Sequence, residues 1–160
     1  MSRSADVLTL TAYHEAGHAA VALHLGRPIH KVSIEPQRQR LGHCQLTRGS
    51  SKPAASVIER EALILLAGMA AESRMSGRYN LEAAARDLRE LETLSEIGGG
   101  SERQLARAQR RWLDKVESLL DRPGVWTTVS AIAKALLEQQ TISGRMARHL
   151  YEQEMQRVQE

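Results

Sequence analysis

The stretch TAYHEAGHA occupies residues 11–19 and decides how the N-terminal part of this chain folds. It lies in an alanine-rich, apolar segment that predicts a helix over about residues 7–25, with Thr9 or Thr11 capping its start. Gly26 and Pro28 predict the end of this helix, because glycine adopts the left-handed cap conformation and proline cannot continue a helix. The quoted stretch is therefore expected inside a helix.

Two histidines and a glutamate in this helix form the pattern His-Glu-x-x-His, at His14, Glu15 and His18. Residues four apart lie on one helix face, so both imidazoles can bind one zinc ion, which accepts histidine nitrogen at about 2.0–2.1 Å. Glu15 lies one step round the helix, where it can reach a water on the metal without being a ligand. The metal would polarise a scissile carbonyl, and Glu15 would act as general base.

The alternative interpretation is a solvated helix face on which both histidines and Glu15 are ordinary surface groups. Small apolar neighbours such as Ala16, Ala19 and Ala20 indicate instead that the helix is largely buried. Burying two imidazoles and a carboxylate without partners would cost free energy. The sequence therefore favours a zinc site of the kind found in peptidases.

The composition indicates one globular domain over residues 1–160. Aromatic residues make up only 3% of the chain, so the core is expected to consist of aliphatic side chains on packed helices. The single cysteine, Cys44, cannot form an internal disulfide, and no stretch reaches the roughly 18 apolar residues of a membrane span. The N-terminus lacks the apolar run of a signal peptide. These features predict a soluble, cytoplasmic protein.

The rest of the chain predicts a mainly α fold of the α+β class, in which a small β-hairpin or sheet packs on the metal-binding helix. Residues 29–34 predict a strand, and residues 42–47 a weaker second strand that could pair with it as a hairpin. Residues 54–75 predict a buried central helix, because the middle of this segment is apolar nearly all round.

Four further helices are expected after the central one. Asn80 can cap the first of them, and Ser101 with Gln104 matches a capping box at the start of the second. The glycines at 98–100 separate a metal-helix and hairpin half, residues 1–97, from a helical half, residues 101–160. The four helices are expected over residues 81–97, 101–120, 125–139 and 143–156.

Several stretches of the chain together resemble the FtsH family of membrane-anchored, AAA+-coupled zinc peptidases. The metal helix is followed, in the family's order, by a strand pair, a central helix and a C-terminal helix-turn. The matching residues are 11–19, 29–36 with 41–43, 65–72 and 136–144. The resemblance covers nearly the whole chain and implies a helical zinc metalloprotease domain.

The resemblance also implies a third zinc ligand, an aspartate on a helix well downstream of the paired histidines. Asp87 stands in the matching place, although residues 81–86 replace the family's Gly- and Asn-containing lead-in. Two histidines and one carboxylate leave a fourth position open for water, which suits catalytic zinc. A solvated helix charge is the alternative interpretation of Asp87.

Glu72 is the rival ligand, because it lies at the end of an apolar helix where a lone carboxylate needs a partner. The resemblance implies instead that Glu72 accepts the free ring N–H of a ligating histidine. A surface charge at a helix end is the open alternative.

The second expected strand bears on substrate binding. Its residues Gly42, His43, Cys44, Gln45 and Leu46 could form an edge to which an extended substrate adds by backbone hydrogen bonds, or could simply be a short protected edge. His43 and Cys44 could also bind metal, but lone residues of these types are usually structural.

Nucleic acid is not an expected partner, because the net charge is only +3. A basic helix face near the middle of the chain is interrupted by one aromatic residue, Trp112, and offers a poor surface for base stacking. Its members, expected to be solvated, are Arg103, Arg107, Arg110 and Arg111. His24 and His30 are expected to be surface or packing residues.

The chain contains no Gly-x-x-x-x-Gly-Lys-Ser/Thr phosphate loop. The ATPase and the membrane anchor of the resembled family are thus absent from these residues. We expect an ATP-independent zinc endopeptidase that cuts peptides or unfolded protein segments. The alternative is a non-catalytic, metal-stabilised interaction module that acts with an AAA+ partner. The sequence leaves open whether the chain forms a homo-oligomer.

Overall fold

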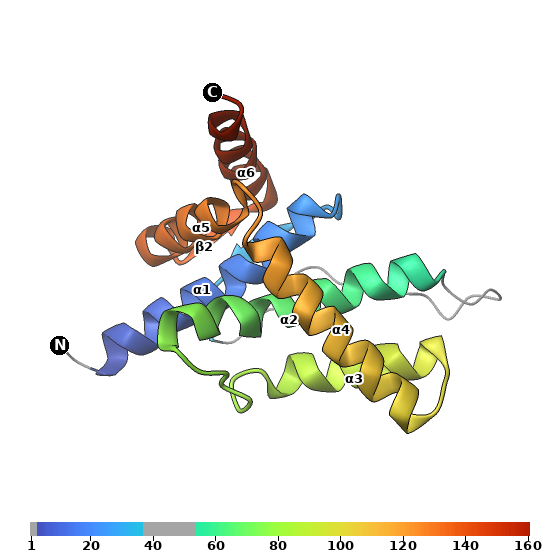
Figure 1. The fold of residues 1–160 in the computed structure, drawn as a ribbon. Helices are drawn as coiled ribbons and strands as arrows, with labels where there is room; N and C mark the ends of the chain where they lie inside the picture. Colours follow the sequence, from blue (N-terminus) through green and yellow to red (C-terminus); the bar gives the residue numbers. More distant parts are fainter. Residues whose placement is uncertain (1–2, 37–53) are drawn as a thin grey trace.

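The computed structural model describes residues 3–36 and 54–160, and these residues form six helices and one two-stranded antiparallel sheet (Figure 1). The expected mainly α fold with a small β element is confirmed. Within the described ranges, no helix combines the length and the apolar character needed to cross a bilayer. The elements are α1 (Arg3–His24), β1 (Lys31–Ser33), α2 (Ala55–Ser76), α3 (Ala85–Gly98), α4 (Glu102–Leu120), α5 (Val125–Gln139), β2 (Thr141–Ser143) and α6 (Gly144–Val158).

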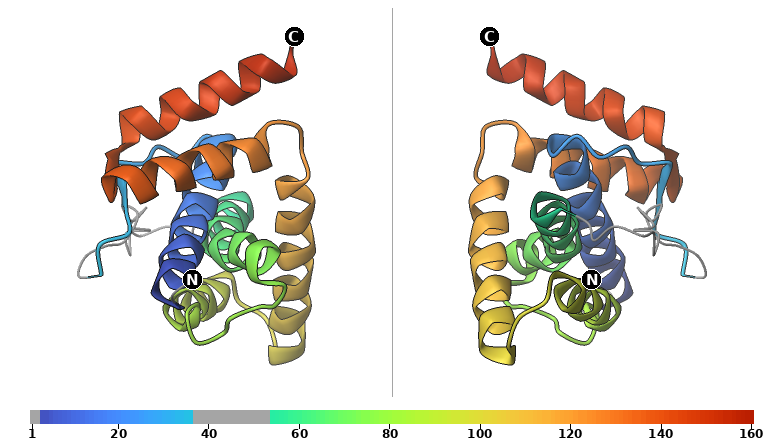
Figure 2. Two further views of the ribbon diagram at one scale, coloured as in Figure 1. Left: turned by 90° about the vertical axis from the view of Figure 1, so that its left-hand side faces the viewer. Right: turned by 90° about the vertical axis from the view of Figure 1, so that its right-hand side faces the viewer.

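Helix α2 is the central helix, as its apolar sequence predicts, and it contacts α1, α3 and α4. Figure 2 shows α1 and α2 side by side in both views, with α4 running crosswise to them on the side of α2. Small residues let α1 and α2 approach closely: a Cβ at Gly17 would lie 2.5 Å from the Ala67 carbonyl oxygen and 2.6 Å from the Ala71 Cβ. A larger residue at position 17 would force the two helices apart.

The sheet pairs a strand near the start of the chain with a strand that precedes the last helix. Val32 of β1 pairs with Ile142 of β2, and both side chains are buried. The sequence predicts a strand at 29–34, and the structure confirms residues 31–33 of it. The expected hairpin partner, 42–47, lies outside the described residues. Among the described residues, β1 pairs with the stretch 141–143, where the sequence suggests only a break between two helices.

Two of the expected helix starts are wrong. Helix α1 begins at Arg3, so the predicted cap Thr11 lies inside the helix and its hydroxyl donates to the Val7 carbonyl at 2.9 Å. Asn80 caps a preceding turn through Ala83 N–H at 3.1 Å, and α3 begins only at Ala85. Other boundaries agree with the prediction to within two residues, and the Ser101–Gln104 capping box is present.

The C-terminal half packs directly on the helix that carries the histidines. Tyr13 of α1 stacks on Trp126 of α5 with ring centroids 5.8 Å apart, and the Arg74 guanidinium lies 5.3 Å from the Trp126 ring centroid. These contacts tie α1, α2 and α5 together beside His14. The division of residues 1–160 into one domain with two halves stays a prediction.

Candidate metal centre

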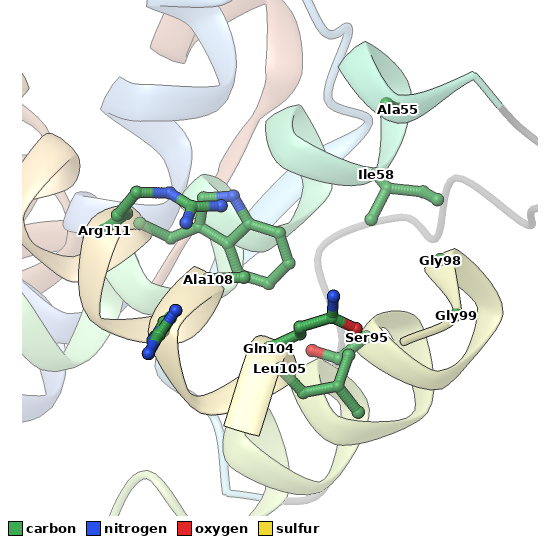
Figure 3. A pocket seen from close by; sticks show the side chains of 11 residues that line it. Ala55, Ile58, Ser95, Gly98, Gly99, Gln104, Leu105, Ala108 and Arg111 are labelled. Carbon is green, nitrogen blue, oxygen red and sulfur yellow. The ribbon is translucent and has the colours of Figure 1, made fainter. Parts of the chain in front are cut away.

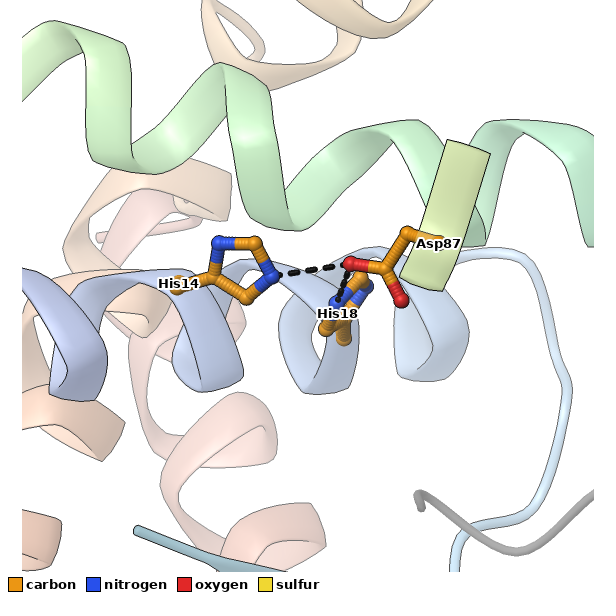
Figure 4. A group of neighbouring side chains, drawn as sticks. All are labelled: His14, His18 and Asp87. Atoms are coloured by element: carbon orange, nitrogen blue, oxygen red, sulfur yellow. Dashed lines mark hydrogen bonds and ion pairs between the residues drawn. The ribbon is translucent and has the colours of Figure 1, made fainter. Parts of the chain in front are cut away.

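Three predicted ligands, far apart in the sequence, meet at the crossing of α1, α2 and α3. His14 and His18 project from α1, and Asp87 projects from the first turn of α3 (Figure 4). The Nε2 atoms of His14 and His18 lie 2.9 and 3.1 Å from Asp87 Oδ2. One ligand atom from each of the three residues lies within 4.8 Å of the other two. The two imidazoles are buried and the carboxylate is partly exposed.

The donor set and its spacing fit a zinc ion. Bond lengths of about 2.0–2.1 Å in a tetrahedral site place ligand atoms roughly 3.3 Å apart. The two histidine–aspartate separations are a few tenths of an ångström shorter than that. Small side-chain movements would therefore open the site to an ion. Three protein ligands would leave the fourth position free, as in catalytic zinc sites.

The Nδ1 atom of each imidazole has its own buried partner on α2. His14 Nδ1 lies 2.9 Å from Glu72 Oε2, and His18 Nδ1 lies 2.7 Å from the Ile64 carbonyl oxygen. Both oxygens can only accept, so each Nδ1 carries the proton and donates it. The Nε2 atoms are then the ones that face Asp87 and would bind a metal. Such partners fix the ring orientation of metal-binding histidines.

The hydrogen bond that the resemblance implies between Glu72 and a ligating histidine is thus present. The sequence does not predict the hydrogen bond from His18 to the Ile64 carbonyl. A backbone oxygen carries no sequence signal of its own. The available clue is Gly68, an isolated glycine within an apolar helix, since such a residue often marks a close approach. Gly68 lies one helical turn from Ile64 and one from Glu72.

Opposite charges stabilise the cluster without a metal. Burial alone lowers the pKa of His14, but hydrogen bonds to Asp87 and Glu72 outweigh it and raise that pKa to about 10. Burial also lowers the pKa of His18, but the Asp87 charge outweighs it, so the pKa of His18 is raised. Burial tends to raise the pKa of Asp87, but the two imidazoles hold it well below its usual range. Protons thus occupy the positions for which a cation would compete.

Glu15 lies beside this cluster without joining it. Burial raises the pKa of the Glu15 carboxyl, while the nearby His18 and His14 charges oppose the rise. The side chain therefore interacts electrostatically with both imidazoles. A carboxyl group with a raised pKa next to a cation site suits proton transfer near neutral pH.

The other predicted candidates lie away from the centre or outside the described residues. Gly42, His43, Cys44, Gln45 and Leu46 fall in the undescribed range, so the edge-strand prediction is untested. His24 packs against α6, with its Nδ1 3.1 Å from the Tyr151 hydroxyl, and His30 is exposed. The four arginines expected on a solvated face, Arg103, Arg107, Arg110 and Arg111, are all exposed.

A separate cavity of about 680 Å³ lies between α2, α3 and α4 (Figure 3). Its lining includes the apolar side chains of Ile58, Leu105 and Trp112, together with the exposed residues Arg107 and Arg111. No residue of the His14–His18–Asp87 cluster lines it. It is therefore distinct from the candidate metal centre.

Comparison with known proteins gives consistent matches for the N-terminal part. The model of peptidase family M41 matches residues 3–97. The chain is 36% identical over 96 residues to "ATP-dependent zinc metalloprotease FTSH 9, chloroplastic/mitochondrial" of Oryza sativa subsp. japonica, a match that covers 56% of this chain and 12% of that protein. It is 38% identical over 90 residues to "ATP-dependent zinc metalloprotease FtsH" of Caulobacter vibrioides. That match covers 53% of this chain and 14% of the relative. The chain thus matches only a small part of the length of these relatives.

Proposed function

We propose, from the premise that this chain belongs to peptidase family M41, that it is an endopeptidase whose zinc is held by His14, His18 and Asp87. The family membership confirms the resemblance drawn from the sequence. The observation that carries the proposal is the cluster of the three ligand atoms within 4.8 Å, with each imidazole oriented by a separate acceptor on α2.

A zinc ion in this centre would supply Lewis acidity, which lowers the pKa of a water molecule and polarises a peptide carbonyl. The protein's own groups have distinct tasks. Glu72 and the Ile64 carbonyl hold the Nδ1 protons of His14 and His18, so that both Nε2 lone pairs face the site. Asp87 adds negative charge from a different helix and closes the ligand set.

Glu15 is the proposed general base. It would take the proton of the attacking water and pass it to the nitrogen of the leaving amine. The raised pKa of its carboxyl supports this role, because it makes the carboxylate a stronger base toward the water proton, while the amine nitrogen is more basic still and can receive that proton afterwards. Its position next to His14 in the helix keeps it close to the site without making it a ligand.

The proposed substrates are peptides and unfolded protein segments. The relatives named above are described as ATP-dependent, but the residues matched here contain no phosphate loop. We propose that peptide cleavage by this chain itself needs no ATP. A cytoplasmic location and an AAA+ partner stay predictions.

The proposal is tested by comparing zinc-loaded wild type with Glu15→Gln on an internally quenched peptide and on unfolded casein. Glu92→Gln is the matched control, since Glu92 is an exposed glutamate on α3. We expect kcat/KM to fall about 10²–10⁴-fold for Glu15→Gln and to stay unchanged for the control. Zinc content, measured by mass spectrometry, should be equal in all three proteins. A chelator should abolish cleavage, and ATP should leave it unchanged.

Two outcomes would contradict the proposal in different ways. Undiminished cleavage by Glu15→Gln would remove Glu15 from the role of base. Absence of cleavage by the fully zinc-loaded wild type would favour the non-catalytic interaction module.

A further inference from the structure

The helix α2 presents a regular stripe to the two histidines. Ile64, Gly68 and Glu72 are spaced four residues apart and so lie on one face of the helix. The Ile64 carbonyl accepts from His18, and the Glu72 carboxylate accepts from His14. Gly68 is the middle member of the stripe and lies between these two contacts.

A side chain at position 68 would collide with both imidazoles. A Cβ built on Gly68 would lie 2.7 Å from His14 Nε2 and 2.6 Å from His18 Cε1, and it would be closer still to His18 Nε2. Real Cβ atoms do not approach other heavy atoms to such distances. The two Nε2 atoms are the same atoms that face Asp87. Even one methyl group at this position would therefore displace the nitrogens that would bind the metal.

The imidazoles cannot easily turn aside. Rotation of either ring away from position 68 would break the hydrogen bond that its Nδ1 makes with α2. Both of these bonds are buried, so their donors would be left without water as a substitute partner. The side chains of His14 and His18 are thus trapped between their acceptors and the backbone of α2.

We propose that Gly68 is a positioning residue of the metal centre, whose missing side chain leaves room for the two Nε2 atoms and the ion. This inference rests on the proposed zinc site. It assigns a role to α2 beyond that of the acceptors: the bare backbone at Gly68 forms one wall of the site. An alanine there would alter the coordination geometry while leaving all three ligands in the chain.

Helix packing alone does not account for Gly68. Gly17, the close-contact glycine of α1, has a different environment, because its Cβ would meet the Ala67 carbonyl and the Ala71 side chain rather than an imidazole. Gly17 therefore permits the approach of the two helices. Gly68 permits the placement of the histidine rings within that approach.

The test compares Gly68→Ala with Gly98→Ala. Gly98 is the matched control, because its Cβ would meet only Ile58 side-chain atoms, at 3.6 and 4.0 Å. Zinc affinity is measured by competition with a chromophoric chelator, and the ligand field by the visible spectrum of the Co²⁺-substituted proteins. We expect Gly68→Ala to bind zinc about 10–100-fold more weakly than wild type and to show an altered Co²⁺ spectrum. Gly98→Ala should match wild type in both measurements.

A second variant separates a collision with the ring from general damage to the fold. In the metal-free proteins, Gly68→Ala should lower the thermal midpoint in the wild-type background but much less in a background that carries both His14→Ala and His18→Ala, because the two rings that it strikes are gone. Recovery of folding in this combined variant supports the inference even where Gly68→Ala alone does not fold. An equal loss in both backgrounds overturns it.

The outcomes also distinguish this inference from the function on which it rests. Zinc binding by wild type that persists unchanged in Gly68→Ala, with an unchanged Co²⁺ spectrum, overturns the role of Gly68 and leaves the zinc site intact. Absence of zinc binding by wild type overturns the zinc site, and the inference with it.

Discussion

Replacing Glu72 with alanine should weaken the metal centre without touching a ligand. The Glu72 carboxylate is buried and accepts from His14 Nδ1 at 2.9 Å. Its removal leaves a buried N–H without an acceptor, which costs about 1–3 kcal/mol. It also frees the ring to rotate. Loss of such a partner typically reduces metal affinity by about 10–100-fold, equivalent to roughly 1.4–2.8 kcal/mol.

Glu72→Gln provides a graded comparison. Glutamine has the same length and retains a carbonyl oxygen that can accept from His14, so only the charge is lost. Hydrogen bonds to charged groups contribute about 1.5–3 kcal/mol, compared with about 0.5–1.5 kcal/mol for neutral ones. The loss of zinc affinity for Glu72→Gln should therefore be about tenfold or less. The expected order of affinity is wild type, then Glu72→Gln, then Glu72→Ala.

The assay is a chelator competition with zinc at constant pH, together with thermal unfolding of the metal-free proteins. Glu92→Ala serves as the control, because it removes an exposed carboxylate from α3. Zinc affinity in Glu72→Ala equal to that of this control would refute the orienting role. So would a larger loss in Glu72→Gln than in Glu72→Ala, because the retained acceptor would then have no value.

Three further perturbations test other contacts. Asp87→Ala should lower zinc affinity more than Glu72→Ala, because it deletes a ligand; equal zinc titration curves for Asp87→Ala and wild type would contradict that. The metal-free protein should lose stability, by up to a few kcal/mol, as pH rises from about 6.5 to 10. The sign follows from the raised pKa of His14, because above pH 6.5 the unfolded state releases a proton that the folded state still holds. The free energy of unfolding is measured by denaturant titrations across this pH range. A free energy of unfolding that does not change with pH would contradict the pairing of His14 with Asp87 and Glu72. Gly144→Ala should destabilise the protein by about 1–3 kcal/mol in chemical unfolding, since its Cβ would lie 2.8 Å from the Ile29 carbonyl carbon. An unchanged midpoint would argue against the close approach of Ile29, which precedes β1, to the start of α6.

Local sequence signals predict most of the helices. Capping and breaking residues act over a single turn, so Gly26 and the Ser101 capping box mark boundaries that the structure reproduces. Threonine is a weaker signal, because its hydroxyl can also bond back to the carbonyl four residues earlier, as Thr11 does. The start of α1 is misplaced for that reason.

Long-range pairing leaves a weaker trace. The strands β1 and β2 have three residues each, too few for a period of two to stand out from chance. Their pairing depends on where α5 ends, which places Ile142 beside Val32 across more than a hundred residues. A hairpin with the nearer segment is the natural guess from sequence. The pairing of β1 with β2 is set by the packing of α5 on α1.

The metal ligands are predictable to different degrees for a physical reason. His14 and His18 belong to one helix turn, so their spacing alone brings them to one face. Asp87 is supplied by another helix, and spacing within the sequence says nothing about how α3 is placed; the family pattern identifies it instead. The backbone groups are the least visible, because a carbonyl oxygen such as that of Ile64 is common to every residue.

The small residues of α1 and α2 connect these observations. Helix α2 can orient the imidazoles of α1 only if the two helices lie close enough for acceptors on α2 to reach the rings. Glycine at positions 17 and 68 allows that approach, first between the helices and then between the helix and the rings. The alanine-rich surfaces that look like ordinary packing in the sequence are therefore a condition for the site. Substitutions that enlarge them should lower metal affinity before they abolish folding, because the ring positions tolerate less displacement than the core does.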